Sequence, residues 1–135
     1  MKILRYAAVC CLVFLFAIEG AGKCGVPAVT EAYKQSKAVF VGEVLKVVKE
    51  GDVKTFTFKV EKYWKGATDE EIEINVQETM RYQAWFEVGE KYLVFARGEK
   101  GHEKLWEVRC SRSTRLADAS EDIKKLGRAK KPVGK

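Results

Sequence analysis

Cysteine and histidine are the residue types in this chain best suited to metal binding or nucleophilic chemistry, and both are scarce. The 135 residues include four cysteines, Cys10, Cys11, Cys24 and Cys110, and a single histidine, His102. Structural zinc sites take four ligands from such side chains, and two of the cysteines lie inside an apolar N-terminal run. The remaining two cysteines and one histidine make a poor metal site, so we expect no metal and no cofactor.

Catalytic residues do not form a recognisable set in the sequence. His102 follows Gly101 in a polar turn, where the expected role is that of a solvated side chain. The acidic run 69–71 is typical of an exposed turn, whereas glycoside hydrolysis needs two carboxylates held across a cleft. The phosphate-binding pattern Gly-x-x-x-x-Gly-Lys-Ser/Thr does not occur. We therefore predict a binding protein and not an enzyme.

Residues 1–22 have the pattern of a secretory signal peptide. Lys2 and Arg5 give a positive start, Tyr6–Ile18 is apolar, and small residues end the segment. The apolar run is shorter than the ~20 residues that span a bilayer. We therefore expect cleavage, secretion to the extracellular space or the periplasm, and no membrane span in the mature chain. The pattern favours cleavage after Gly20 or Gly22.

Export determines how the remaining cysteines are interpreted. An oxidising compartment favours disulfide formation, and Cys24 and Cys110 are the cysteines that follow the leader. A bridge between them closes most of the domain into one loop and is expected to stabilise it by about 4–5 kcal/mol through the chain entropy of the unfolded state. We predict this disulfide as a structural feature.

Hydrophobic periodicity predicts one domain, residues 23–127, with two short helices and five strands. The expected helices are 28–36 and 113–126, and the expected strands are 38–48, 53–63, 71–77, 91–96 and 104–110. The basic residues 128–135 are predicted to be disordered. Short strands bent at glycines such as Gly42 favour a small barrel over a parallel sheet. The predicted fold is all-β with flanking helices, a five-stranded OB-like Greek-key barrel, and a flat sandwich is the competing architecture.

Aromatic and basic residues indicate where partners would bind. Trp64 and Trp106 lie in or at the end of predicted strands, where packing is the expected role. Trp85 and Phe86 lie in an irregular connection and are candidate contact residues. The formal net charge is +6, but basic residues are interleaved with acidic ones. This pattern favours attraction to an anionic surface over a nucleic-acid site.

A series of short motifs runs through residues 23–127 in a defined order and spacing. They are Cys24-x-x-Pro27 before a helix, the strand Ser36–Val44, Tyr63-Trp64-Lys65-Gly66 at a strand end, Phe86-x-x-Gly89-x-x-Tyr92-Leu93-Val94-Phe95-Ala96, and Cys110-Ser-Arg-Ser-x-x-Leu116. Together the motifs resemble the tissue inhibitors of metalloproteinases, in particular the N-terminal netrin-like OB domain of short single-domain relatives.

The resemblance implies a secreted protein that binds an extracellular zinc metalloprotease. In inhibitory members, the α-amino group and carbonyl of a first cysteine coordinate the protease's zinc ion, beside a ridge of neighbouring loops. The corresponding contact residues here would be Gly22, Lys23, Cys24, Gly25, Val26, Trp85 and Phe86.

The sequence departs from the family pattern at the chelating position. Gly22 replaces the first cysteine of a Cys-x-Cys pair, and Lys34 replaces a third cysteine. Cleavage after Ala21 would place the Gly22 amine in the chelating register, without the disulfide that fixes it in the family. The alternative function is a non-inhibitory extracellular module that binds proteins or polyanions.

Overall fold

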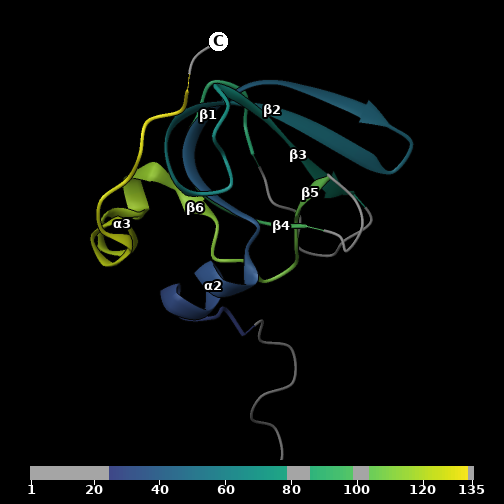
Figure 1. Ribbon diagram of the computed structural model, residues 1–135. Helices are drawn as coiled ribbons and strands as arrows, with labels where there is room; N and C mark the ends of the chain where they lie inside the picture. The colour runs from purple at the N-terminus through teal and green to yellow at the C-terminus, as the bar shows by residue number, and fades with distance from the viewer. Residues whose placement is uncertain (1–24, 79–85, 99–103, 134–135) are drawn as a thin grey trace, which may run out of the picture.

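Short helices flank a set of β-strands in the computed structural model, which describes residues 25–78, 86–98 and 104–133 (Figure 1). In these ranges the helical segments are α2 (Val29–Gln35), the 3-10 turn η2 (Leu116–Asp118) and α3 (Ser120–Leu126). The strands are β1 (Ala38–Glu50), β2 (Val53–Lys65), β3 (Glu71–Gln77), β4 (Lys91–Gly98), β5 (Leu105–Glu107) and β6 (Thr114–Arg115). No helix in the described ranges has the length and apolarity needed to cross a membrane.

The strands close into a five-stranded barrel. β1 pairs with β2 along one edge and with β4 along the other, and the ring continues from β2 through β3 and β5 to β4. β3 and β5 run parallel, whereas the other neighbouring strands are antiparallel. β6 pairs with β4 outside the ring. The predicted OB-like barrel with flanking helices is therefore confirmed, and the flat sandwich is excluded because the β1–β4 pairing closes the ring of five strands.

Gly42 lets β1 bend enough to pair with both β2 and β4. The register between β1 and β2 shifts between Val41 and Gly42, as expected for a bulge. A Cβ atom at this position would lie 2.9 Å from the carbonyl oxygen of Lys59 and 3.1 Å from a ring carbon of Phe40. Any other residue would push β1 and β2 apart, so the prediction that this glycine marks a bend is confirmed.

Hydrophobic clusters lie on both faces of β1 and β4. Inside the barrel, the ring of Phe58 makes edge-to-face contacts with Phe40, Phe86 and Tyr92, at centroid distances of 5.5, 5.0 and 6.4 Å. Between the barrel and the helices lies a second cluster, formed by Ala32, Val39, Val41, Leu93, Phe95 and Ala119. Strands covered on both faces have continuous apolar sequences, which explains the runs at 38–41 and 92–96.

The segment after β4 differs from the sequence prediction. β5 spans three residues and not 104–110. The C-terminal helix begins at Ser120 and not at residue 113, because Thr114 and Arg115 pair with β4. Gly127 is the C-cap residue of this helix and has φ +80°.

The basic C-terminal segment lies against the barrel, so its predicted disorder is wrong for residues 128–133. Lys130 and Tyr63 exchange two backbone hydrogen bonds, of 2.8 and 2.9 Å, and the Val133 N–H donates to the Thr68 carbonyl at 2.8 Å. The indole N–H of Trp64 donates to the Gly127 carbonyl at 2.9 Å. These bonds extend the packing of α3 along the end of β2.

Replacing Phe58 by alanine tests the account of the core. Phe58 is fully buried at the centre of the aromatic cluster, so the F58A variant should lose about 3–5 kcal/mol of unfolding free energy, because the cavity cannot collapse around the remaining rings. Urea denaturation followed by tryptophan fluorescence measures this change. The F58L variant serves as a volume control and should lose clearly less, whereas equal losses for both variants would contradict this packing.

Candidate functional site

The segment before α2 contains two of the predicted contact residues, Gly25 and Val26. Gly25 and Val26 are exposed, and the Val26 side chain has a relative accessibility of 52%. The preceding candidates Gly22, Lys23 and Cys24 lie outside the described residues. An exposed apolar side chain next to a glycine suits contact with a partner protein, provided that the segment is held in place.

Arg112 holds this segment. Its guanidinium donates from Nη1 to the Pro27 carbonyl oxygen at 2.9 Å, and from Nε and Nη2 to the two carboxylate oxygens of Asp122 at 2.8 and 2.9 Å. Hydrogen bonding to Asp122 raises the pKa of the Arg112 side chain. We call these three residues the Arg112 clamp. Because the bidentate pair fixes the plane of the guanidinium, the clamp joins the N-terminal segment to α3 across more than 80 residues of sequence.

The turn that carries Arg112 is organised around a buried carboxyl group. Glu107 is only 4% exposed and accepts hydrogen bonds from the hydroxyls of Ser111 and Ser113, the latter at 2.7 Å. The Ser113 hydroxyl also accepts from the Phe95 N–H at 2.9 Å, which ties the turn to β4. Burial raises the pKa of Glu107 to about 7, against the opposing effect of the two serine hydrogen bonds. The carboxyl is therefore harder to ionise than an exposed glutamate side chain.

Cys110 lies in this same turn, with a positive φ of 63°. Its sulfur is disulfide-bonded, and the predicted partner Cys24 lies outside the described residues. The Cys24–Cys110 pairing therefore stays a prediction.

Of the two aromatic residues predicted as contacts at 85–86, the structure describes one. Trp85 lies outside the described residues. Phe86 is 8% exposed, and its ring packs edge-to-face against Phe56, Phe58 and Tyr92 at 5.4, 5.0 and 4.9 Å. The prediction that the Phe86 side chain forms a contact surface is wrong, because the barrel interior takes up the ring.

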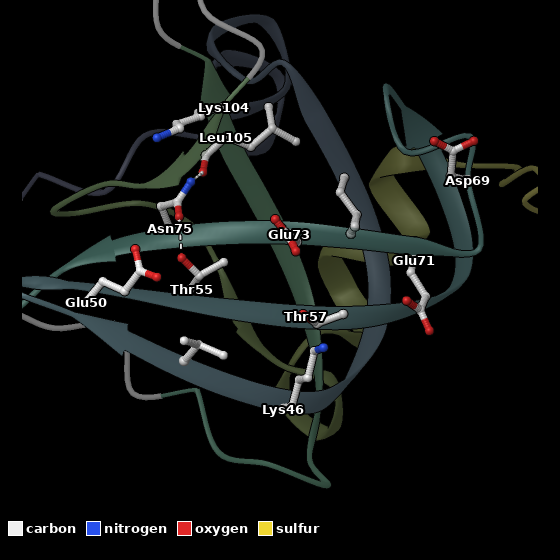
Figure 2. Close-up of a pocket in the computed structure, with 12 residues that line it drawn as sticks. Lys46, Glu50, Thr55, Thr57, Asp69, Glu71, Glu73, Asn75, Lys104 and Leu105 are labelled. Carbon is white, nitrogen blue, oxygen red and sulfur yellow. Dashed lines mark hydrogen bonds between the residues drawn. The ribbon is translucent and has the colours of Figure 1, made fainter.

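A second candidate site is a hollow of about 730 Å³ on the outside of the barrel, which we call the concave face. Figure 2 shows β3 crossing this face between β2 and the start of β5, with side chains of β1 on the far side of β2. Thr55 Oγ1 donates to Asn75 Oδ1 at 2.7 Å, and Asn75 Nδ2 donates to the Leu105 carbonyl oxygen at 3.3 Å (Figure 2). These bonds join β2, β3 and β5 beneath the hollow.

The concave face has the opposite charge to the chain as a whole. Its charged side chains are the carboxylates of Glu50, Asp69, Glu71 and Glu73 and the ammonium groups of Lys46 and Lys104. The balance is acidic, whereas the chain carries +6. The described residues contain no group of three or more His, Cys, Asp or Glu side chains arranged to hold a metal ion.

Sequence reasoning missed the concave face and the clamp for different reasons. The alternating pattern of β2 and β3 identifies the residues that face outward. Asn75, a polar residue between Ile74 and Val76, is one of them and could have indicated the concave face. The contact between Arg112 and Pro27 joins distant segments, and no local pattern reports it.

Comparison with known proteins adds no assignment. No protein-family model matches the chain, and no curated protein matches it.

The buried Glu107 generates a prediction for stability against pH. Its pKa is 4.5 in the unfolded reference and about 7 in the folded protein, so the folded state holds a proton that the unfolded state has lost between these values. Stability should therefore fall as pH rises through this window, by about 3 kcal/mol. The E107Q variant should lack this contribution, because glutamine stays neutral.

Urea denaturation of both proteins at pH 5 and pH 8 measures the difference. The two proteins have all their other carboxylates in common, so the contributions of those groups cancel in the comparison. The stability of E107Q relative to the wild type should therefore increase from pH 5 to pH 8. Parallel profiles for the two proteins would contradict a raised pKa.

Proposed function

We propose that this chain is a secreted binding protein that inhibits an extracellular zinc metalloprotease through its N-terminal segment. The observation that carries the proposal is the Arg112 clamp, which fixes the Pro27 carbonyl at 2.9 Å and leaves Gly25 and Val26 exposed. The OB-like barrel gives this segment a rigid base. The resemblance of the motif order to the metalloproteinase inhibitors supplies the class of target.

The chemistry of the target's zinc defines what the N-terminus would do. Catalytic zinc sites keep one position open for water or substrate, and a neutral α-amine has a lone pair that can take this position. The α-amino group has a pKa near 8 in proteins, so a useful fraction is neutral at physiological pH. The clamp would hold Pro27, and Val26 would pack beside the protease's cleft.

The state of the N-terminal amine provides the direct test. Proteins beginning at Gly22, Lys23 and Cys24, and a Gly22 form with an acetylated amine, are assayed against a panel of secreted zinc metalloproteases. The Gly22 form should inhibit, and acetylation should raise its inhibition constant at least about tenfold, because an amide nitrogen is a poor zinc ligand. Equal inhibition by the acetylated form, or none by any form, would contradict the proposal.

The clamp itself is tested by the R112K variant on the Gly22 form. Lysine keeps the charge and loses the bidentate geometry, so inhibition should weaken while the barrel stays folded. The R115K variant is the matched control, because the Arg115 ion pair with Glu87 at 3.4 Å lies on exposed side chains away from Pro27. Equal inhibition by R112K and R115K would show that the clamp does not position the segment.

A second candidate function, polyanion binding, is favoured by the C-terminal segment. Its exposed basic residues are Lys124, Lys125, Arg128, Lys130 and Lys131, which we call the basic strip. The backbone bonds between Lys130 and Tyr63 hold this strip against β2. Several cations gathered in one segment attract sulfated or phosphorylated polymers more strongly than scattered charges do.

Heparin affinity as a function of salt tests this second candidate. Wild-type binding should weaken steeply as salt rises, because the interaction is between exposed charges. The K125E/K131E variant should bind at least about tenfold more weakly, and the K46E/K104E variant, with the same charge change on the concave face, should not. Equal losses for the two variants would assign binding to net charge alone and contradict a role for the strip.

A further inference from the structure

The second half of β1 has a free edge. Pairing of β1 with β4 ends at Glu43 opposite Lys91. The last bonds on that side join Val44 to the residues before β4, from the Val44 N–H to the Glu90 carbonyl at 3.0 Å and from the Gly89 N–H to the Val44 carbonyl at 2.8 Å. Beyond this point, the described part of the chain gives residues 45–50 backbone partners only in β2. Figure 1 shows the β1–β2 hairpin reaching out from the barrel.

Apolar side chains concentrate along this free edge. Leu45, Val47 and Val48 have relative accessibilities of 39, 42 and 49%. Edge strands with exposed apolar side chains readily pair with another strand, and natural proteins normally protect them with charges, proline or a cover. The free edge has neither proline nor a cover among the described residues, and its charges are Lys46, Lys49 and Glu50.

The turn geometry sets which backbone groups point outward. Gly51 and Asp52 form a two-residue turn between Glu50 and Val53, and Gly51 has φ +58°, as expected of a type II′ hairpin. Residues that flank such a turn exchange hydrogen bonds with each other. The backbone N–H and C=O groups of Val48 and Glu50 therefore face β2, and those of Val47 and Lys49 face away from it.

We propose that two copies of this chain form a dimer by antiparallel pairing of their free edges, centred on Val48. In this register Val48 lies opposite Val48 of the second copy, and Val47 exchanges backbone hydrogen bonds with Lys49 of the second copy. Lys46 lies opposite Glu50 of the second copy, twice by symmetry. The result is one continuous sheet that joins the two concave faces.

Charge complementarity selects this register. Lys46, Val48 and Glu50 all line the concave face, so the two new Lys46–Glu50 pairs lie on the same face and flank the valine contact. A register centred between Val47 and Val48 is ruled out, because it would place residues whose backbone groups face outward opposite residues whose backbone groups face β2. A register centred on Val47 loses both ion pairs. The Lys49 side chain is already paired with Glu78 at 2.8 Å, so only its backbone is needed.

The short edge predicts a weak dimer. Interfaces below about 1,200 Å² belong to transient complexes, so association should appear at high protein concentration. Sedimentation velocity on the full exported chain, from about 10 µM to about 1 mM, should show a dimer fraction that rises with concentration. A chain that remains monomeric throughout this range would overturn the proposal and leave the edge to a strand of another protein.

A charge swap tests the register. The K46E and E50K variants each create two like-charge contacts and should raise the dimer dissociation constant at least about tenfold, whereas the double variant K46E/E50K should restore it to near the wild-type value. The K125E and E121K variants make the same charge changes at exposed positions of α3 and should dimerise like the wild type. Failure of the double variant to recover, or equal effects of the α3 controls, would overturn the pairing.

Discussion

β1 is hydrogen-bonded to β2 along one edge and to β4 along the other, and the rest of the architecture depends on this double pairing. It is possible because Gly42 brings its backbone to a distance from Lys59 that no side chain would allow. The pairing closes the barrel, encloses the Phe58 cluster, and presents an outer face on which α2 and α3 pack. It also ends at Glu43, so the remainder of β1 projects as a hairpin with one edge open.

The turn at 108–113 connects this framework to the proposed binding segment. Glu107 is held by two serine hydroxyls and linked through Ser113 to the backbone of β4. Five residues later Arg112 reaches both Asp122 and the Pro27 carbonyl. Ionising the buried Glu107 carboxyl is unfavourable, and its ionisation would destabilise the turn that supports the N-terminal segment. Polar groups buried at a point where three segments meet specify one arrangement of these segments, because other arrangements would leave the groups without partners.

The sequence predicted the barrel well because its strands carry strong local signals. Val53–Tyr63 alternates cleanly, and the burial of both faces in the first half of β1 and in β4 is visible in their continuous apolar runs. Prediction failed where the outcome depends on distant partners. Phe86 was predicted to lie in an exposed connection, whereas its ring packs inside the barrel. Residues 128–133 were predicted to be disordered because no local pattern indicates their bonds to Tyr63 and Thr68. The Arg112 clamp was invisible for the same reason.

The proposed inhibition requires the N-terminal segment to bind a protease through its zinc ion. Calorimetric titration of the form that begins at Gly22 into one zinc metalloprotease, with and without the metal, tests this most directly. The account predicts binding to the zinc-loaded protease and a loss of affinity of at least about tenfold for the zinc-free protease at unchanged fold. Equal affinity for both forms would contradict zinc-directed binding and would leave the exposed segment as a surface for protein contact alone.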